Sequence, residues 1–405
     1  MRLRVLIIFS CFLILGTNSS AQMRSESDAN ILSACAAFAP NGTSAVAEVE
    51  INGVFLEITS ADGKVSHLNL PLRYPPHESH PTNRPINRRD WTCTIYFNHS
   101  SDFVAFGISS RFGQPEVTHL QMGVAELKTA AWIGDFDVGP QLDFLPVLLA
   151  GFLEETNTLI VAGRIKNRRG AEQESLRASV QFSPHGEQLS STPTVRKPEK
   201  ITDAFRSYAD AGHNRLWLFA CGYTRVHPNH VPHCPISVTS LEGEDLFSAT
   251  LDPSSYGGKR DTMWMWPGTF AAPDSSTIVI AETVSGKDTV WRVDMQKKSI
   301  DRFVLPDKHF VKYNGLHDAA LSPDGEVLAV LLDRIELGFP YFLDNYVFKG
   351  TDVVVMQLRP FGLLGLIPHK DSSYTAALAV DHRKGKAIVL AYTQGHLVRQ
   401  EFSAP

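Results

Sequence analysis

The sequence predicts an all-β protein, a β-propeller of seven four-stranded antiparallel blades. Short apolar runs joined by Gly- or Pro-containing turns form hairpins, and a second hairpin follows most of them. These pairs recur along the chain, with about 57 residues between successive turns. Repeated four-stranded units can close into a ring that leaves no long exposed strand edge. We therefore expect one domain over residues 22–405, and blade-like units on both sides argue against two β domains divided near residues 190–203.

The N-terminal segment has the three parts of a secretory signal peptide. Arg2 and Arg4 precede an apolar run from Val5 to Gly16, and small residues follow up to Ala21. The run is shorter than the roughly 20 residues that span a bilayer, and no later run is long and apolar enough. We therefore expect residues 1–21 to be a cleaved signal peptide, no membrane span after cleavage, and a secreted or periplasmic protein.

The clearest hairpin is Leu321–Leu332, in which two apolar runs flank a Pro-Asp-Gly turn. Proline fixes φ at the start of such a turn and glycine accepts the positive φ that the turn requires. The same pattern recurs in residues 36–49 and 270–281, and less clearly after Thr94, Leu153, Ala209 and Ala379. The expected blades cover approximately residues 31–70, 91–133, 144–195, 204–251, 267–306, 315–366 and 374–403. The last blade has either three strands or a fourth from residues 22–30.

Residues 321–332 (LSPDGEVLAVLL) resemble the WD40-like propeller repeat of bacterial secreted and periplasmic proteins, the TolB type. Residues 37–49 and 270–281 are similar to it to a lesser degree. The resemblance implies a seven-bladed propeller and implies no particular chemistry. The Trp-Asp signature of true WD40 blades is absent from this sequence, so the resemblance does not extend to scaffolds of that kind.

Four cysteines remain after cleavage of the signal peptide, and an oxidising compartment allows them to pair. Cys221 and Cys234 flank one loop, whose ends a hairpin would bring together. Cys35 and Cys93 each lie five residues before a turn, at Pro40 and Asn98, and so occupy equivalent positions in adjacent blades. We expect a disulfide in each pair, the alternative for Cys35 and Cys93 being two buried free thiols.

Charge and motifs exclude several classes of function. Cleavage removes two of the 38 basic residues and none of the 43 acidic residues, so the mature chain has a net charge of −7. This acidic balance argues against nucleic acid as a partner. The chain contains no lipase-type serine elbow, zinc-protease, phosphate-loop or dinucleotide motif, so we expect no cofactor.

One histidine-rich loop invites a metal interpretation. It contains His227, His230 and His233 between Cys221 and Cys234. The spacing of the two cysteines matches no common zinc motif, and bridged cysteines cannot bind a metal. We therefore expect a solvated loop and no metal site.

Candidate ligand-binding residues come from the expected topology, because ligands of propellers meet the residues that precede each innermost strand. These positions hold Arg89, Asp90, Arg206, Trp264, Trp266, His317, Asp318 and Tyr374. We expect a monomeric binding scaffold for a protein, peptide or glycan, with packing between blades as the competing role of the two tryptophans. The alternative is a propeller hydrolase or lactonase, with His317, Asp318 and Asp90 as the catalytic candidates.

Overall fold

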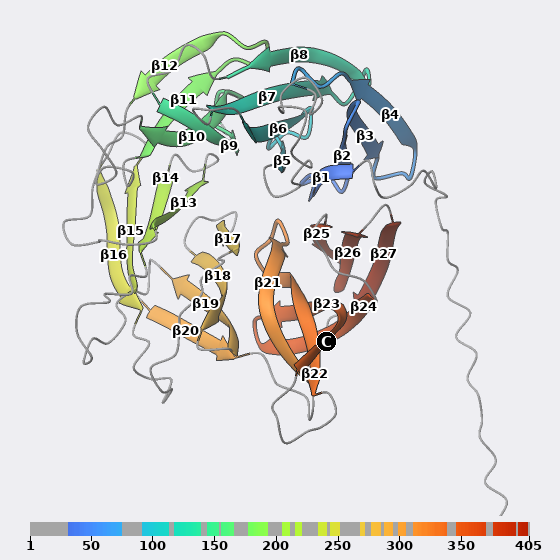
Figure 1. Ribbon diagram of the computed structural model, residues 1–405, viewed down its shortest axis with the longest axis vertical. Helices are drawn as coiled ribbons and strands as arrows, with labels where there is room; N and C mark the ends of the chain where they lie inside the picture. The colour runs from blue at the N-terminus through green and yellow to red at the C-terminus, as the bar shows by residue number, and fades with distance from the viewer. Residues whose placement is uncertain are drawn as a thin grey trace, which may run out of the picture.

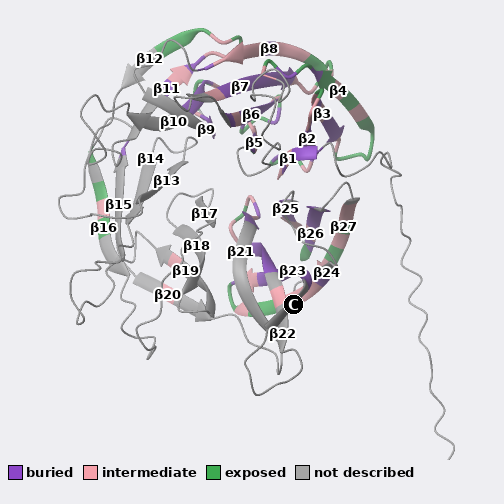
Figure 2. Cartoon of the chain, viewed as in Figure 1, coloured by how far each residue is buried: buried purple, intermediate pink, exposed green. Residues whose placement is uncertain are grey.

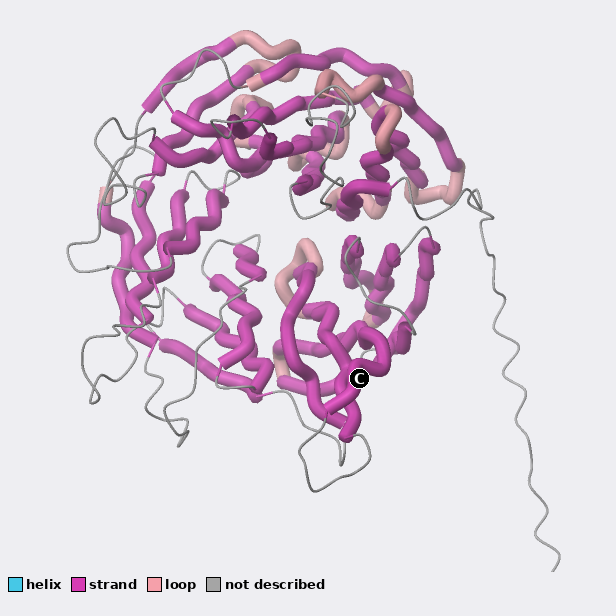
Figure 3. The backbone as a smooth tube through the Cα atoms, viewed as in Figure 1, coloured by secondary structure: helices cyan, strands magenta, loops and turns pink. Residues whose placement is uncertain are grey.

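A computed structural model describes residues 31–74, 91–112, 117–138, 144–153, 155–165, 177–192, 205–210, 215–220, 234–240, 244–251, 268–271, 277–284, 287–294, 299–304, 311–337, 346–369, 376–393 and 396–403. All regular secondary structure in these residues is β, as the tube in Figure 3 shows. Within the same residues, no helix is long and apolar enough to cross a membrane.

The strands form antiparallel sheets in chain order, and we number the sheets from the N-terminus. Sheet 1 contains β1 (Ile31–Phe38), β2 (Ser44–Glu50), β3 (Gly53–Thr59) and β4 (Val65–Leu70). Sheet 2 contains β5 (Trp91–Phe97), β6 (Phe103–Phe112), β7 (Val117–Glu126) and β8 (Ala131–Asp137). Sheet 3 contains β9 (Phe144–Phe152), β10 (Leu159–Ile165), β11 (Arg177–Phe182) and β12 (Gln188–Thr192).

The remaining four sheets follow the same order. Sheet 4 contains β13 (Phe205–Asp210), β14 (Arg215–Ala220), β15 (Cys234–Ser240) and β16 (Asp245–Leu251). Sheet 5 contains β17 (Gly268–Ala271), β18 (Thr277–Val284), β19 (Lys287–Asp294) and β20 (Ser299–Val304). Sheet 6 contains β21 (Val311–Leu321), β22 (Val327–Leu337), β23 (Tyr346–Leu358) and β24 (Phe361–His369). Sheet 7 contains β25 (Ala376–Arg383), β26 (Lys386–Thr393) and β27 (His396–Ser403), and no other described strand pairs with β27.

The sheets are arranged in a closed ring (Figure 1). The first strand of each sheet contacts the first strand of the next, from β1 to β5 and onward through β9, β13, β17 and β21 to β25. The ring closes where β25 contacts β1. This arrangement confirms the predicted all-β propeller, because each sheet packs against its two neighbours around a common axis.

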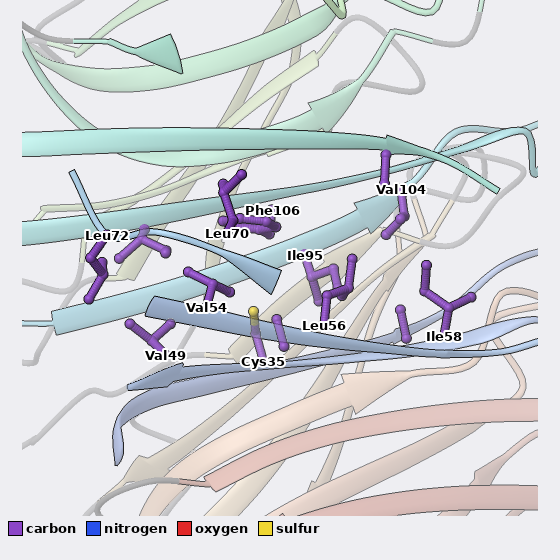
Figure 4. Packing of buried hydrophobic residues seen from close by; sticks show 14 of the residues in the cluster. Cys35, Val49, Val54, Leu56, Ile58, Leu70, Leu72, Ile95, Val104 and Phe106 are labelled. Atoms are coloured by element: carbon purple, nitrogen blue, oxygen red, sulfur yellow. The ribbon is translucent and has the colours of Figure 1, made fainter. Parts of the chain in front are cut away.

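The strands of sheets 1, 2, 3, 6 and 7 carry many buried residues, drawn purple in Figure 2. Their apolar side chains form clusters between sheets 1 and 2, 2 and 3, 6 and 7, and 7 and 1. Between sheets 1 and 2 they form one cluster, part of which is shown in Figure 4. Ala45, Ala47 and Val49 of β2 belong to this cluster. Val46 lies on the opposite face of the same strand and packs against sheet 7. Alternate residues of a strand point to opposite faces, so nearly continuous apolar runs are needed where both faces of a sheet are covered.

The cysteine pair predicted for adjacent blades is bridged. Cys35 on β1 forms a disulfide with Cys93 on β5, and their Cα atoms are 5.4 Å apart. Both residues lie within or against the apolar cluster between sheets 1 and 2. The second predicted pair cannot be placed, because Cys221 lies outside the described residues.

The two faces of the ring carry different connections. Because the strands of each sheet are antiparallel, first and third strands end on one face, which we call the turn face, and second and fourth strands end on the other, the loop face. On the turn face the longest connection is the six residues between Phe152 and Leu159. On the loop face the connections reach 20 residues, between Leu70 and Trp91.

Side chains in the short connections link neighbouring sheets along the turn face. Asn98 donates a hydrogen bond of 2.9 Å to the side chain of Asn157, which joins sheets 2 and 3. His382 pairs with Asp324 at 2.6 Å, which joins sheets 7 and 6. Arg383 donates to the carbonyl oxygen of Pro40 at 2.7 Å, which joins sheets 7 and 1. At these three contacts, side chains on the turn face hold neighbouring sheets together.

Candidate functional site

The loop face is the candidate functional face. All the connections longer than six residues start and end there, including the 16 residues between Leu251 and Gly268 and the 13 between Ala220 and Cys234. Long connections are where binding and catalytic residues concentrate, because a rigid scaffold positions them without depending on their sequence. The first residue of every innermost strand also lies on this face, next to the ring axis.

Three predicted site residues lie on described strands. Arg206 is the second residue of β13, and His317 and Asp318 lie within β21. Both strands are innermost in their sheets, so these residues border the ring axis from sheets 4 and 6. The other five candidates, Arg89, Asp90, Trp264, Trp266 and Tyr374, lie outside the described residues, as do His227, His230 and His233.

β21 is irregular at His317. Leu316 pairs with Leu332 and Asp318 pairs with Leu331, which leaves His317 as an extra residue in the ladder with β22. A second irregularity lies between Tyr313 and Leu316. Neighbouring residues of a regular strand point to opposite faces, but a bulge changes the direction of the side chains around it. The backbone of β21 therefore departs from regular alternation next to His317 and Asp318.

Sheet 6 extends farther on the loop face than its neighbours. β21 and β22 have 11 residues each and β23 has 13, and their pairing continues to Val311, Glu336 and Tyr346. The pairing of β24 with β23 stops at Thr351, so the extension has three strands. It stands directly beside the residues His317 and Asp318.

A second group of polar side chains lies on the loop face between sheets 1 and 2. Arg73, just after β4, donates through Nε to Asp135 Oδ1 at 3.0 Å, and its backbone N–H donates to Gln121 at 2.9 Å. Gln121 is buried and in turn donates to Asp135 at 3.1 Å and to the carbonyl oxygen of Pro71 at 3.0 Å. These bonds fix the start of the longest connection in the chain to sheet 2.

Tyr74 completes this polar group. Its hydroxyl donates to Asp137 Oδ2, and its ring lies against His119 with the centroids 4.0 Å apart. Burial and the nearby Asp137 carboxylate raise the pKa of Tyr74 to about 12. Burial lowers the pKa of His119, which favours its neutral form at neutral pH. The other oxygen, Asp137 Oδ1, is buried and has no hydrogen-bond partner among the described residues, so this group can accept one further donor.

Sequence reasoning did not find this group. Asp135 and Asp137 alternate along β8, which places both on the face toward sheet 1. This alternation is the only sign of the group in the sequence. Arg73, which pairs with Asp135, follows a strand of another sheet, so their contact depends on how two blades pack together. In the part of the chain that the structure describes, no three His, Cys, Asp or Glu side chains are placed to hold a metal ion.

Comparisons with known proteins give fold neighbours only. No family model matches the sequence, and no curated protein matches it. Among solved structures, the Dos1 propeller aligns with a TM-score of 0.46 and 12% identity over 95% of this chain and 94% of that chain. The propeller domain of the Trilobed protease from Pyrococcus furiosus aligns at 0.45 and 9% identity over 92% and 93%. An acylaminoacyl peptidase from Pyrococcus horikoshii aligns at 0.46 and 11% identity, over 92% of this chain and 53% of the peptidase. None of these similarities bears on the function of this chain.

Proposed function

We propose that this protein is a secreted or periplasmic binding scaffold that holds a protein, peptide or glycan ligand on the loop face, around the ring axis. The observation that carries the proposal is the difference between the faces: every connection longer than six residues belongs to the loop face. The turn face has short connections that link neighbouring sheets, so its residues are committed to the ring. The Cys35–Cys93 disulfide supports an oxidising compartment.

The fixed start of the 71–90 connection supports the same proposal. Arg73 and Tyr74 hold this segment to sheet 2 through Asp135 and Asp137. The connection also contains the candidates Arg89 and Asp90. A binding loop that is held in place at its start loses less conformational entropy when its ligand binds, and therefore binds more tightly. The resemblance of residues 321–332 to WD40-like propellers of bacterial secreted proteins fits this function and remains part of the proposal.

Binding of the purified full chain to glycan and peptide arrays tests the proposal. For any bound ligand, we expect the double variant Trp264→Ala/Trp266→Ala or the variant Arg206→Ala to lose about tenfold or more in affinity. The matched control on the turn face is Lys64→Ala/Glu187→Ala, which changes two exposed residues and is expected to bind as the wild type does. Equal binding by all variants, or a loss confined to the turn-face control, contradicts a ligand site on the loop face.

A second function, hydrolysis or lactone opening, is favoured by one observation, the bulge at His317 beside Asp318. In this alternative the two side chains act as an acid–base pair beside the ring axis. Turnover of a panel of lactones and glycosides by the wild type, with loss of turnover in His317→Ala and unchanged thermal stability, distinguishes it from simple binding.

A further inference from the structure

The contact between sheets 7 and 1, where the ring closes, collects buried acidic side chains. We call this contact the closing seam, formed by Ile31, Ala34, Val46, Glu48 and Glu57 of sheet 1 and by Ala377, Ala379, Asp381, Leu390 and Tyr392 of sheet 7. Four acidic side chains are buried among the described residues, and three of them belong to this seam: Glu48, Glu57 and Asp381, with 8%, 6% and 3% of their surface exposed. The fourth, Asp352, is paired with Arg334 inside sheet 6.

Strand register places these acids on the faces that meet at the seam. Glu48 lies two residues from Val46 on β2, and Glu57 of β3 pairs directly with Val46, so all three share one face of sheet 1. Asp381 follows Ala377 and Ala379 by alternation on β25. Tyr392 of β26 contributes its buried hydroxyl to the same seam, on the sheet 7 side, where it influences the Glu48 carboxyl.

We propose that the closing seam is a proton-controlled latch, tight while the Glu48 carboxyl is protonated and looser once it ionises. The geometry supports this assignment because the seam has no covalent link among the described residues, and because Glu48 lies at its loop-face end. At the turn-face end, Arg383 pairs with Asp381 at 2.8 Å and donates to the carbonyl oxygens of Ala39 and Pro40 at 3.1 and 2.7 Å. The loosening is therefore confined to the loop-face end, with the Arg383 contacts as its hinge.

Titratable and charged side chains around the closing seam come from six strands. Glu50 on β2 and Glu57 on β3 are acidic, and His67 on β4 lies 3.9 Å from Glu57. On sheet 7, β26 contributes Tyr392, and β27 carries Arg399 opposite Leu390, which is part of the seam. β25 contributes Asp381, whose negative charge Arg383 offsets. Glu48 itself has no basic side chain as a hydrogen-bond or ion-pair partner among the described residues, so its ionised form is poorly compensated.

Burial and the neighbouring acids favour the protonated form of this side chain. Burial is the main cause that raises the pKa of Glu48 to about 7, with Glu50 and Glu57 adding to the effect and the Tyr392 hydroxyl opposing it. Burial also raises the pKa of Glu57 and of Asp381. A carboxyl whose folded pKa lies above its unfolded value of about 4.5 destabilises the folded state as pH rises between those two values. The latch therefore loosens between about pH 4.5 and about pH 7.

Hydrogen exchange of the full chain, read by mass spectrometry near pH 5 and near pH 8 and corrected for intrinsic exchange, tests the latch. In the wild type we expect peptides from β1–β2 and β25–β26 to lose about tenfold in protection at the higher pH, and peptides from β5–β6 to change little. Glu48→Gln is close in size to the wild-type side chain but cannot ionise, so its seam peptides are expected to lose most of the pH response. Glu187→Gln, an exposed site on sheet 3, is the control and should behave as the wild type does.

Two results would overturn the proposal: a wild-type seam without the pH response, or a Glu48→Gln variant that retains it. Tyr392→Phe supplies an independent measurement. The Tyr392 hydroxyl favours the ionised form of Glu48, so its removal should raise the pKa of Glu48 and move the midpoint of the seam transition to higher pH. A loss of protection that is equal at every pH, with no shift of the midpoint, would mean that Tyr392 and Glu48 only pack the seam.

Discussion

Sheet 1 makes two seams of opposite character. Its contact with sheet 2, which we call the bridged seam, contains the Cys35–Cys93 disulfide and a cluster of buried apolar side chains. Its contact with sheet 7, the closing seam, has a smaller apolar cluster, two buried carboxyls on its own side and a third on sheet 7. A disulfide and apolar burial are independent of pH over the ordinary range, whereas a buried carboxyl is not. The ring is thus held permanently on one side of sheet 1 and conditionally on the other.

The largest effect is expected from removal of the disulfide. The bridge closes a loop with a sequence separation of 58, so Cys35→Ala/Cys93→Ala should lower the free energy of unfolding by about 4 kcal/mol. Urea unfolding without reductant measures this loss. If the double variant lost less than the Arg383 variant below, the bridged seam would not be the stronger of the two.

Next in size is the hinge of the closing seam. Arg383→Ala leaves the buried Asp381 carboxylate unpaired and removes the donor to two carbonyl oxygens of sheet 1. We expect a loss of about 2 to 3 kcal/mol, less than for a fully buried pair because the guanidinium is partly solvated. The control is Lys386→Ala, whose pair with Glu401 is exposed on both sides and should cost less than about 0.5 kcal/mol. Equal effects in thermal unfolding would show that Arg383 does not hold the seam.

A gain of stability is expected from Glu48→Gln at high pH. Near pH 8 the wild type carries an ionised, buried carboxyl and the variant does not, so the variant should be more stable by about 2 kcal/mol, allowing for partial solvation. Below about pH 4 the carboxyl is mostly protonated in both the folded and the unfolded state, so the difference should become small. Denaturation curves at several pH values give the difference directly, and a constant difference across the range would contradict the assigned pKa.

The smallest effects are expected from alanine substitutions at two turn glycines. They distinguish the loss of a contact with Arg383 from backbone strain alone. Gly42 has φ +92° and Gly63 has φ +87°, so alanine is strained at both. An added Cβ at Gly42 would meet the Arg383 guanidinium, but at Gly63 it would meet nothing within 4 Å. We expect Gly63→Ala to cost about 1 kcal/mol and Gly42→Ala about 2 kcal/mol. If thermal unfolding gave equal losses, the turn at Pro40 would not be packed against Arg383.

The sequence predicts the disulfide of the bridged seam but not the polar contacts of the closing seam, and the reason is physical. Cys35 and Cys93 occupy equivalent positions before their own turns, so a repeat alone is enough to pair them. The Arg383 contact joins residues separated by 344 positions, and nothing local in the sequence indicates it. Glu48 lies in an alternating strand where a carboxylate normally faces solvent, and it is buried only because sheet 7 covers that face.

The candidate site also has a part that the sequence predicts and a part that it does not. Hairpin spacing predicts Arg206, His317 and Asp318 just before innermost strands, whereas the structure places them within the innermost strands β13 and β21. The repeat gives the order of the strands but not where each strand begins. The bulge at His317 and the group around Arg73 and Asp135 depend on side chains of neighbouring strands and sheets, which single-sequence periodicity does not report.

The disulfide also has a consequence for the order in which the ring is built. Cys35 and Cys93 both belong to the first quarter of the chain. Once these residues have left the ribosome and met an oxidant, sheets 1 and 2 can be covalently joined while most of the chain is still being made. The closing seam needs Tyr392 and Arg383, which are synthesised long after Cys93. In the nascent chain, one face of sheet 1 therefore stays exposed until sheet 7 has been made. The carboxyls of Glu48 and Glu57 keep this exposed face hydrated.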